Sequence, residues 1–276
     1  MIHKKMLLKR INFYIIASLI SFFIMLPFFW MISTSFKDAK ALLKIPIQWI
    51  PKEIYTGAYE KLFEVFPFGR AIFNSLFISF ATTFIAVFSA ATAAYVFSKI
   101  EFKGRNILFF VFLATMMIPG QVTMIPNYLV LRNLGLLNTY VGVMLPSFFN
   151  AFGTFLLRQN MLTIPKSFSE AAIIDGASHG KIFLKIILPL SKPAITTLSV
   201  ITFMGSWNSY LWPLIVLTDK NKMTFPIGLS LLDGQYSNEY NLLMAGSLIS
   251  IIPILIVYIF AQKYFMEGMN VGGLKG

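Results

Sequence analysis

Neutral polar and aromatic side chains stand in the most apolar parts of this sequence, where few other groups could interact with a solute. They are Asn150, Trp207, Asn208, Tyr210 and Trp212, with Gln121 and Asn127 as further candidates. An Asn amide can hydrogen-bond to hydroxyl groups, and an indole ring can cover the apolar face of a pyranose ring. These residues are therefore the candidates for lining a substrate route, and their chemistry would suit a neutral solute such as a sugar. Trp and Tyr also anchor proteins at membrane interfaces and Asn also joins helices, so a structural role for each residue stays open.

A second group of residues lies in a polar loop, Arg158 to Lys192, which separates two apolar stretches. Ser167 is followed three residues later by Glu170, which is the pattern of a capping box and predicts that a helix begins there. Gly176 predicts the end of that helix, because glycine readily adopts the left-handed conformation of a helix terminus. Ala171 and Ala172 form a patch of small side chains that another backbone could approach closely.

The second half of the loop predicts another helix. Its lysines, Lys181 and Lys185, lie opposite an apolar face, which is formed by Phe183, Ile186, Ile187 and Leu190. Pro189 predicts that the helix closes near Ile187, because a proline disfavours helical geometry in the residue before it. Asp175 caps this helix or contacts another chain. An amphipathic hairpin that lies on anionic lipid and has no further role is an alternative.

Several kinds of chemistry are excluded by what the sequence lacks. It has no Cys, which excludes thiol catalysis, disulfides and Cys-ligated metals. Its two histidines, His3 and His179, lie outside the apolar stretches, and no phosphate-binding GxxxxGK[ST] motif occurs. We therefore expect no catalytic residue, no metal site and no bound cofactor. Any uphill transport must take its energy from another polypeptide.

The elements that position these residues are strongly apolar. The chain of 276 residues is 57% hydrophobic and 12% charged, which is half of the roughly 25% charge found in soluble domains. Six runs of 23 to 28 residues contain no Asp, Glu, Lys or Arg: Ile11 to Phe36, Ala71 to Ser98, Asn106 to Leu131, Asn133 to Leu157, Pro193 to Thr218, and Tyr240 to Gln262. About 20 apolar residues cross a bilayer as a helix. We therefore predict an all-α membrane protein with six transmembrane helices.

Prolines and cations refine this topology. Kinks or local breaks are predicted within the runs at Pro27, Pro119, Pro126, Pro146 and Pro253. Six spans place both termini on one side, and the segments on that side hold fourteen Lys and Arg against nine on the other. The positive-inside rule then predicts that both termini are cytoplasmic. The outer loop from Lys37 to Arg70 carries prolines and aromatic residues, which indicate an ordered interfacial segment.

The string EAAIIDGA at residues 170–177, with Leu188-Pro189 following Gly176 by twelve and thirteen residues, resembles the EAA loop of type I ABC transporter permeases. These are importers served by a binding protein. More narrowly, the chain is similar to the smaller permease of the carbohydrate-uptake group, to which the maltose importer belongs. The resemblance covers nearly the whole chain and includes Asn74-Ser75, Pro165, Trp207-Asn208 with Pro213, and the ending GMNVGGLKG.

This resemblance implies a type I ABC importer permease fold and a set of partners. These are a second, similar permease, two ATPase subunits that use ATP and Mg, and an external solute-binding protein. The EAA loop would sit in a cleft of the ATPase, with Glu170 paired to a basic group there. The implied coupling residues are Ser167, Glu170, Ala171, Ala172, Asp175, Gly176, Ala177, Leu188 and Pro189. The tail residues Gly272, Gly273, Lys275 and Gly276 would also reach the ATPase. Thr202, Gly205 and Ser206 allow close contact with the partner permease.

The predicted organisation has three parts: residues 1–70 with the first span and outer loop, a permease core at 71–262 that contains the EAA loop at 158–192, and a cytoplasmic tail at 263–276. We predict a permease subunit of a sugar or oligosaccharide importer in a bacterial cell membrane. An importer of glycerol phosphate, an amino acid or a peptide is an alternative. A secondary carrier is disfavoured because no ionisable residue lies within the spans. A non-transporting membrane scaffold would need no coupling loop.

Overall fold

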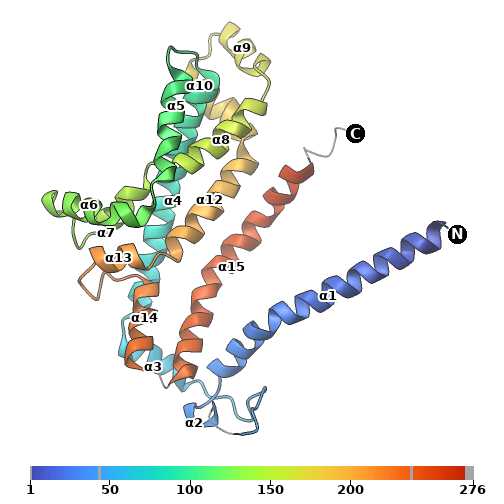
Figure 1. The fold of residues 1–276 in the computed structure, drawn as a ribbon, viewed down its shortest axis with the longest axis vertical. Helices are drawn as coiled ribbons and strands as arrows, with labels where there is room; N and C mark the ends of the chain where they lie inside the picture. The colour runs from blue at the N-terminus through green and yellow to red at the C-terminus, as the bar shows by residue number, and fades with distance from the viewer. Residues whose placement is uncertain (1, 43–44, 237–238, 271–276) are drawn as a thin grey trace. The chain divides into compact units, whose positions relative to one another are not determined.

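Three long helices follow three of the charge-free runs (Figure 1). The computed structural model describes residues 2–42, 45–236 and 239–270, and helices are the only regular secondary structure in these ranges. The long helices are α1 (Ile2–Ser35), α4 (Phe68–Lys99) and α15 (Tyr240–Asn270). Each contains a segment long and apolar enough to cross a membrane. The prediction of a helical membrane-spanning protein is confirmed for these runs.

The other three runs form broken helices. α5 (Arg105–Ala114) ends in a 3₁₀ turn, η1 (Thr115–Met117), and meets α6 (Gly120–Asn133) at 97°. α7 (Tyr140–Met144) and η2 (Leu145–Ser147) meet α8 (Ala151–Thr163) at 47°. α12 (Lys192–Trp207) is followed, after a break of three residues, by α13 (Leu211–Val216). At its other end α12 forms the third bent pair, because it lies at 79° to the preceding segment His179–Leu190. The described residues therefore hold up to six spans if each bent pair counts as one.

The five prolines within the runs behave in two ways. Pro119 directly precedes α6 at the bend between α5 and α6, and Pro146 lies in η2 beside the bend between α7 and α8. The remaining three lie inside helices that continue past them, and these are Pro27 in α1, Pro126 in α6 and Pro253 in α15. A proline removes one backbone donor wherever it stands. Whether the helix breaks depends on what can bind the freed carbonyl.

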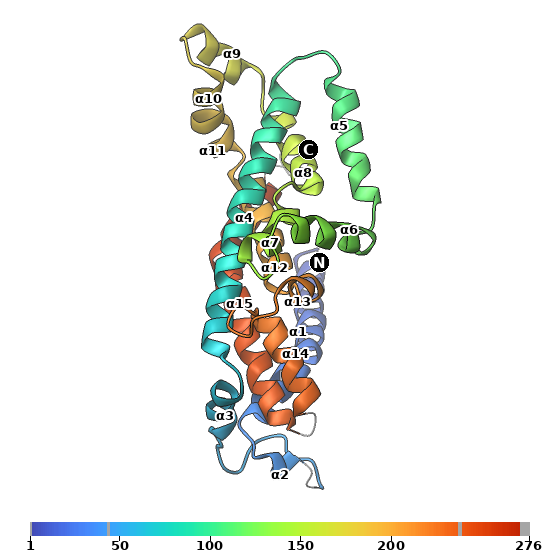
Figure 2. The ribbon, with the colours of Figure 1, turned by 90° about the vertical axis from the view of Figure 1, so that its left-hand side faces the viewer.

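The chain divides into two compact units, Met1–Phe66 with Leu229–Ile252, and Pro67–Gly228 with Pro253–Gly276. In the second unit α4 packs against α8 and α12 (Figure 2). Its contact face is a stripe of small side chains, Ala86, Ala90 and Ala94, each at most 1% exposed. Gly153 of α8 lies close to α12, since a Cβ at this glycine would stand 3.0 Å from a methyl group of Leu198 in α12. Small residues let helices approach closely, which replaces the hydrophobic driving force that lipid does not supply.

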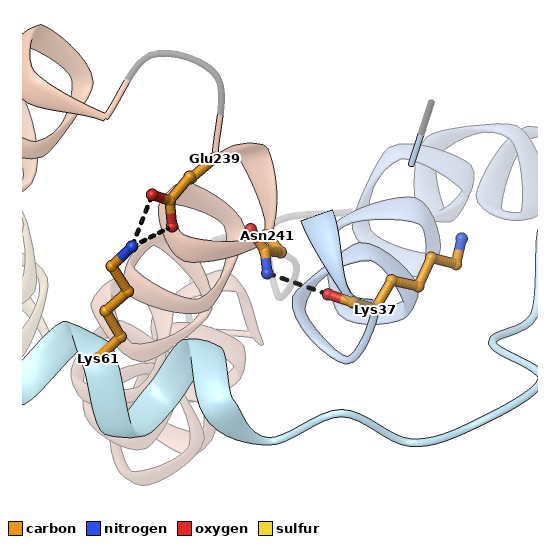
Figure 3. A network of polar contacts seen from close by, with 4 residues as sticks. All are labelled: Lys37, Lys61, Glu239 and Asn241. Carbon is orange, nitrogen blue, oxygen red and sulfur yellow. Dashed lines mark hydrogen bonds and ion pairs between the residues drawn. The ribbon is translucent and has the colours of Figure 1, made fainter. Parts of the chain in front are cut away.

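The first unit orders the outer loop. It contains α2 (Ala39–Leu42), α3 (Gly57–Val65), most of α14 (Phe225–Gln235) and the beginning of α15. Lys61 of α3 forms an ion pair with Glu239 at 2.6 Å, and the Asn241 amide donates to the Lys37 carbonyl at 3.1 Å (Figure 3). Lys37 itself is 3% exposed, and its Nζ donates to the Gln48 carbonyl. Burial lowers the pKa of the Lys37 ammonium group. The loop therefore packs as part of a folded unit.

Candidate functional site

The first helix of the polar loop is α9 (Ser167–Ile174), and it begins where the sequence predicted. The predicted capping box is wrong. The residue that caps α9 is Lys166, and its first turn is held by backbone bonds, including the Glu170 amide to the Lys166 carbonyl at 3.0 Å. Ser167 already has helical geometry, so its hydroxyl is not placed to cap the helix. Ser167 and Glu170 are both exposed, and the Glu170 carboxylate is therefore available to a partner.

Gly176 ends α9 in the predicted way. Its φ is +75°, its amide donates to the Ile173 carbonyl at 3.0 Å, and the Ala177 amide donates to the Ala172 carbonyl at 2.9 Å. These two bonds make a Schellman motif, which satisfies the last carbonyls of the helix. Asp175 does not cap the next helix. That role belongs to Ser178, whose hydroxyl accepts from the Lys181 amide at 3.4 Å.

The second helix runs further than predicted. α10 (His179–Ile182) continues through a π-helical turn, η3 (Phe183–Ile187), into α11 (Leu188–Leu190). The predicted end at Ile187 is wrong because Pro189 falls within the first turn of α11, where no backbone donor is needed.

The wider π turn also rotates the apolar face of this helix by adding one residue to it. Ile182, Phe183 and Ile187 are buried, whereas Leu190 is 47% exposed and does not share their face as predicted. Lys181 and Lys185 are exposed, as expected.

Polar side chains fasten the base of this loop to the end of α4. The Lys99 Nζ donates to the Ile164 carbonyl at 2.7 Å, and the Arg158 Nε donates to the Phe97 carbonyl at 3.1 Å. The Arg158 guanidinium also lies 4.1 Å from the centre of the Phe109 ring. The sequence analysis used Lys99 and Arg158 only to predict the orientation of the spans. It did not predict these contacts, because the spacing of the two residues does not show which carbonyl groups they reach.

Two further contacts join α4 and the segment after it to the loop. The Tyr95 hydroxyl lies 3.2 Å from His179 Nδ1, and Lys166 forms an exposed ion pair with Glu101 at 3.1 Å. The hydrogen bond from Lys166 lowers the pKa of the Glu101 carboxyl, with help from the positive charges of Lys166 and Arg105. Because both partners of this pair are exposed, it contributes little to stability.

The outer surface of α9 is apolar and uncovered in this unit. The helix has no buried residue, and three of its large apolar side chains stand in the open: Phe168 at 50%, Ile173 at 53% and Ile174 at 86% exposed. Ala171 is also exposed, whereas Ala172 packs against the core around Leu157 and Ile182. A short, anchored helix with an acidic group and an apolar face is suited to insert into a groove of another protein.

A cavity of about 630 Å³ lies where the three broken helices meet. Ile118 lines it from the α5–α6 break, Asn150 from the α7–α8 break and Ser209 from the α12–α13 break. α4 contributes Ser75 and Thr82 to its wall. Within a membrane, non-helical backbone is tolerated where it lines a cavity or is covered by protein, because lipid cannot satisfy its polar groups. The breaks and the cavity therefore belong to one feature.

The structure brings only part of the predicted route together. Asn150 and Trp212 line the cavity, as do Thr202, Gly205 and Ser206, which were assigned to helix contact. Asn150 caps α8 by accepting from the Gly153 amide at 3.0 Å, and the Trp212 indole donates to the Val143 carbonyl at 3.1 Å. The remaining candidates, Trp207, Asn208, Tyr210, Gln121 and Asn127, are not among the lining residues.

Trp207 has a packing role in this structure. It is 1% exposed, and its ring lies between Phe203, at 6.3 Å, and Phe225, at 6.2 Å, with both rings nearly parallel to it. Asn208 and Tyr210 are exposed. Thr82 and Thr224 also line the cavity, although neither was a predicted site residue. No signal in the sequence marked either threonine, because its spacing does not show which side chains face the cavity.

Asn74 and Ser75 hold the segment before α14 against α4. The Asn74 amide donates to the carbonyls of Asn221 and Met223, each at 2.9 Å, and its oxygen accepts from the Tyr140 hydroxyl at 2.7 Å. Ser75 accepts from the Phe225 amide at 2.7 Å. The buried residues Asn74 and Ser75 thus attach both the segment at residues 221–225 and Tyr140 of α7 to α4, which lines the cavity.

The structure shows no candidate metal site in the residues that it describes, because no three His, Asp or Glu side chains gather there as a set of ligands. The predicted tail residues Gly272, Gly273, Lys275 and Gly276 lie outside the described residues.

Comparison with known proteins decides the family. The model described as "Binding-protein-dependent transport system inner membrane component" matches residues 84–271. The chain belongs to this family. The permease is 36% identical over 274 residues to the arabinooligosaccharides transport system permease protein AraQ of Bacillus subtilis, covering 97% of this chain and 96% of that one. It is 37% identical over 205 residues to the sn-glycerol-3-phosphate transport system permease protein UgpE of Salmonella typhi, covering 74% and 73%.

A solved structure shares the fold. A chain of a bacterial ABC transporter involved in the import of the acidic polysaccharide alginate superposes with a TM-score of 0.81 at 28% identity, covering 93% of this permease and 97% of that chain. The family and this neighbour confirm the predicted resemblance and the type I permease fold, with the qualification that three spans are broken. They also establish that the permease is a membrane transport subunit rather than a catalytic one.

Proposed function

We propose that this permease forms half of the membrane channel of an ATP-driven importer for a sugar or oligosaccharide. The observation that carries the proposal is the similarity to AraQ over 97% of the chain, since AraQ is named for arabinooligosaccharide transport. The alginate importer, another carbohydrate system, has the same fold at 28% identity. The chain would act in a bacterial cell membrane, with both termini in the cytoplasm.

The polar loop supports a coupling role. α9 presents the Glu170 carboxylate beside exposed apolar side chains, and Lys99 and Arg158 tie the base of the loop to α4. A partner ATPase that binds ATP and Mg would grip α9 together with Asp175, Gly176 and Ala177. Its closure would then move α4, α8 and α12 and switch the cavity between the two sides of the membrane. The tail at residues 272–276 would provide a second contact with the ATPase.

The long first helix supports pairing with a second permease. No residue in the most apolar part of α1 is buried in this chain. Such a surface needs cover from lipid or from another apolar protein surface. The complete importer would contain this permease, a second permease, two ATPase subunits and an external binding protein.

An importer of glycerol phosphate is the second candidate, and the identity of 37% to UgpE favours it. The cavity argues for the sugar, because no ionisable side chain of the described residues lines it. A buried phosphate without a cation would lose its hydration without compensation. Uptake measurements with a neutral oligosaccharide and with glycerol phosphate decide between the two candidates.

The proposal is tested by reconstituting the permease with a candidate partner permease, ATPase and binding protein from the same genome. We expect ATP-dependent uptake of a neutral oligosaccharide. Glu170→Lys and Gly176→Pro should leave membrane insertion intact but abolish uptake, because the loop no longer docks or bends. Lys103→Glu, a charge reversal at an exposed residue of the neighbouring loop, is the control and should transport normally. Normal uptake by both loop variants would refute the coupling role.

A further inference from the structure

Two adjoining cavities lie where the outer loop meets the end of α1. One is an apolar cleft of about 300 Å³, and the other is a polar cavity of about 540 Å³. Pro51 and Ile54 line both of them, so the two cavities share a wall. All of their lining residues belong to the first compact unit, and the proposed function uses none of them.

The apolar cleft continues the uncovered surface of α1. Phe29 and Ile32 line it from α1, and both are also part of the exposed apolar surface of that helix, at 47% and 44% exposed. Trp49 and Ile50 line it from the outer loop. Its one lining hydroxyl among the described residues, that of Ser33, already donates to the Trp49 carbonyl. A polar solute would lose its hydration in this cleft without compensation, whereas an acyl chain would not.

The polar cavity carries a surplus of positive charge. Three lysines stand against two carboxylates in its lining: Lys37, Lys40, Lys52, Asp38 and Glu53. Lys40 and Lys52 are exposed, so their ammonium groups are accessible to a ligand. One oxygen of the Asp38 carboxylate is occupied, because it accepts from the Lys40 amide at 2.8 Å. Such a lining favours an anionic ligand, and paired ammonium groups are common ligands of phosphate.

Contacts with α1 hold the loop that carries these groups. The Lys37 Nζ donates to the Gln48 carbonyl and lies 4.3 Å from the centre of the Trp30 ring. The rings of Trp30 and Trp49 meet edge to face with 5.2 Å between their centres. Tryptophan is enriched where the apolar part of a membrane meets the headgroups. The buried Lys37 thus positions the loop, and the apolar cleft and the polar cavity keep a fixed arrangement at an aromatic pair typical of that interface.

We propose that the two cavities together form a binding site for an anionic phospholipid. An acyl chain lies in the apolar cleft beside Phe29 and Trp49, and the phosphate accepts hydrogen bonds from Lys40 and Lys52 in the polar cavity. A free phosphate would leave the cleft empty. On the predicted topology the lipid belongs to the outer leaflet. The inference goes beyond the proposed function and does not depend on the transported solute, because it requires only that the chain lies in a membrane.

Photo-cross-linking tests the site. The full-length permease, reconstituted with its partners, is placed in phosphatidylcholine nanodiscs that contain phosphatidylglycerol with a photoreactive diazirine in one chain. Mass spectrometry then locates the cross-links. Those to residues 29–36 and 49–54 should saturate as phosphatidylglycerol increases, whereas those to the exposed α1 residues 13–25 should rise in proportion to the lipid. Diazirine-labelled phosphatidylcholine should show no saturation in either segment.

Variants separate the headgroup from the chain. Lys40→Gln combined with Lys52→Gln should raise the phosphatidylglycerol content needed for half-saturation about tenfold, because two cations near the phosphate are lost. Ile50→Asn should weaken the same cross-links by making the cleft polar, and it should fold normally, because Ile50 is 70% exposed. Lys103→Gln combined with Lys220→Gln is the matched control. Both of these lysines are exposed outside the two cavities, and half-saturation should stay within about twofold.

Three results would overturn the site. The first is saturation at the same content of phosphatidylcholine, which would remove the role of charge. The second is an unchanged half-saturation in the double variant of Lys40 and Lys52, or no saturable cross-link to residues 29–36 and 49–54 in the parent. The third is loss of the saturable cross-links on addition of inorganic phosphate, which would show that the polar cavity takes a free anion and not a lipid.

Discussion

At the scale of single residues, Gly176 shows how a loop residue can matter through its backbone alone. Its φ of +75° is unfavourable for any residue with a Cβ, yet no atom lies within 4 Å of the place that a Cβ would occupy. Gly176→Ala should therefore cost about 1 kcal/mol through conformation and nothing through steric clash. Thermal unfolding of the purified complex measures this loss.

Gly180 offers a matched control for this substitution. A Cβ at this position would also stand in open space, but Gly180 lies within α10 and lacks the positive φ. Gly180→Ala should leave stability unchanged or raise it by up to about 1 kcal/mol, because alanine favours helix. Equal losses for the two variants would show that the left-handed conformation of Gly176 is not what limits substitution.

Asn74 is a residue whose side chain joins α4 to two other parts of the chain, the segment before α14 and α7. It is 1% exposed, and its amide and oxygen bind Asn221, Met223 and Tyr140. Asn74→Ala would remove the partner of two part-buried carbonyls and of a hydroxyl, so we expect a loss of about 1–3 kcal/mol and a lower unfolding temperature. Asn133→Ala, at an exposed position, should change stability by less than about 0.5 kcal/mol. A small effect at Asn74 would mean that water replaces its bonds.

At the scale of elements, the contacts of Lys99 and Arg158 make the loop and α4 one lever. Lys99→Met removes the bond to the Ile164 carbonyl but keeps most of the side-chain volume. On the proposed function, ATP hydrolysis should continue while sugar uptake per ATP falls severalfold, because motion of α9 is no longer passed fully to α4. The ratio of uptake to hydrolysis in vesicles is the measurement. Lys103→Met is the control, and a normal ratio in Lys99→Met would exclude this route of coupling.

The sequence predicts which segments are helical and apolar better than it predicts where a helix breaks. Charge-free runs mark all six candidate spans because a charge near the centre of the bilayer is costly. Pro119 and Pro146 stand beside bends, whereas Pro27, Pro126 and Pro253 do not, and the five look alike in sequence. The outcome depends on tertiary contacts and on the cavity.

The loop shows the same division between local and tertiary signals. The left-handed Gly176 was predictable, because its requirement is local to the backbone. The π turn before Pro189 was not, because it depends on how Ile182, Phe183 and Ile187 pack in the core with residues of α4 and α8. In the cavity between the broken helices, Asn150 and Trp212 were predicted from their chemistry, but Thr82 was missed because the sequence does not show which side chains face the cavity.

At the scale of the whole molecule, orientation in the membrane decides whether the proposed coupling is possible. The positive-inside count places the polar loop in the cytoplasm with the termini, and it places the segment before α14 outside. The absence of Cys from the sequence gives a clean background for single-cysteine labelling. Lys185 in the loop and Lys220 before α14 are both exposed, so either position can report its side without disturbing the core.

We expect Lys220→Cys to react with a membrane-impermeant maleimide in intact spheroplasts, and Lys185→Cys to react only after the membrane is opened. Both variants should retain uptake, since each replaces an exposed lysine outside the cavity. An ATPase that uses cytoplasmic ATP can reach α9 only in this orientation. The reverse labelling pattern would put the loop on the wrong side of the membrane and would remove the physical basis for driving this permease through α9.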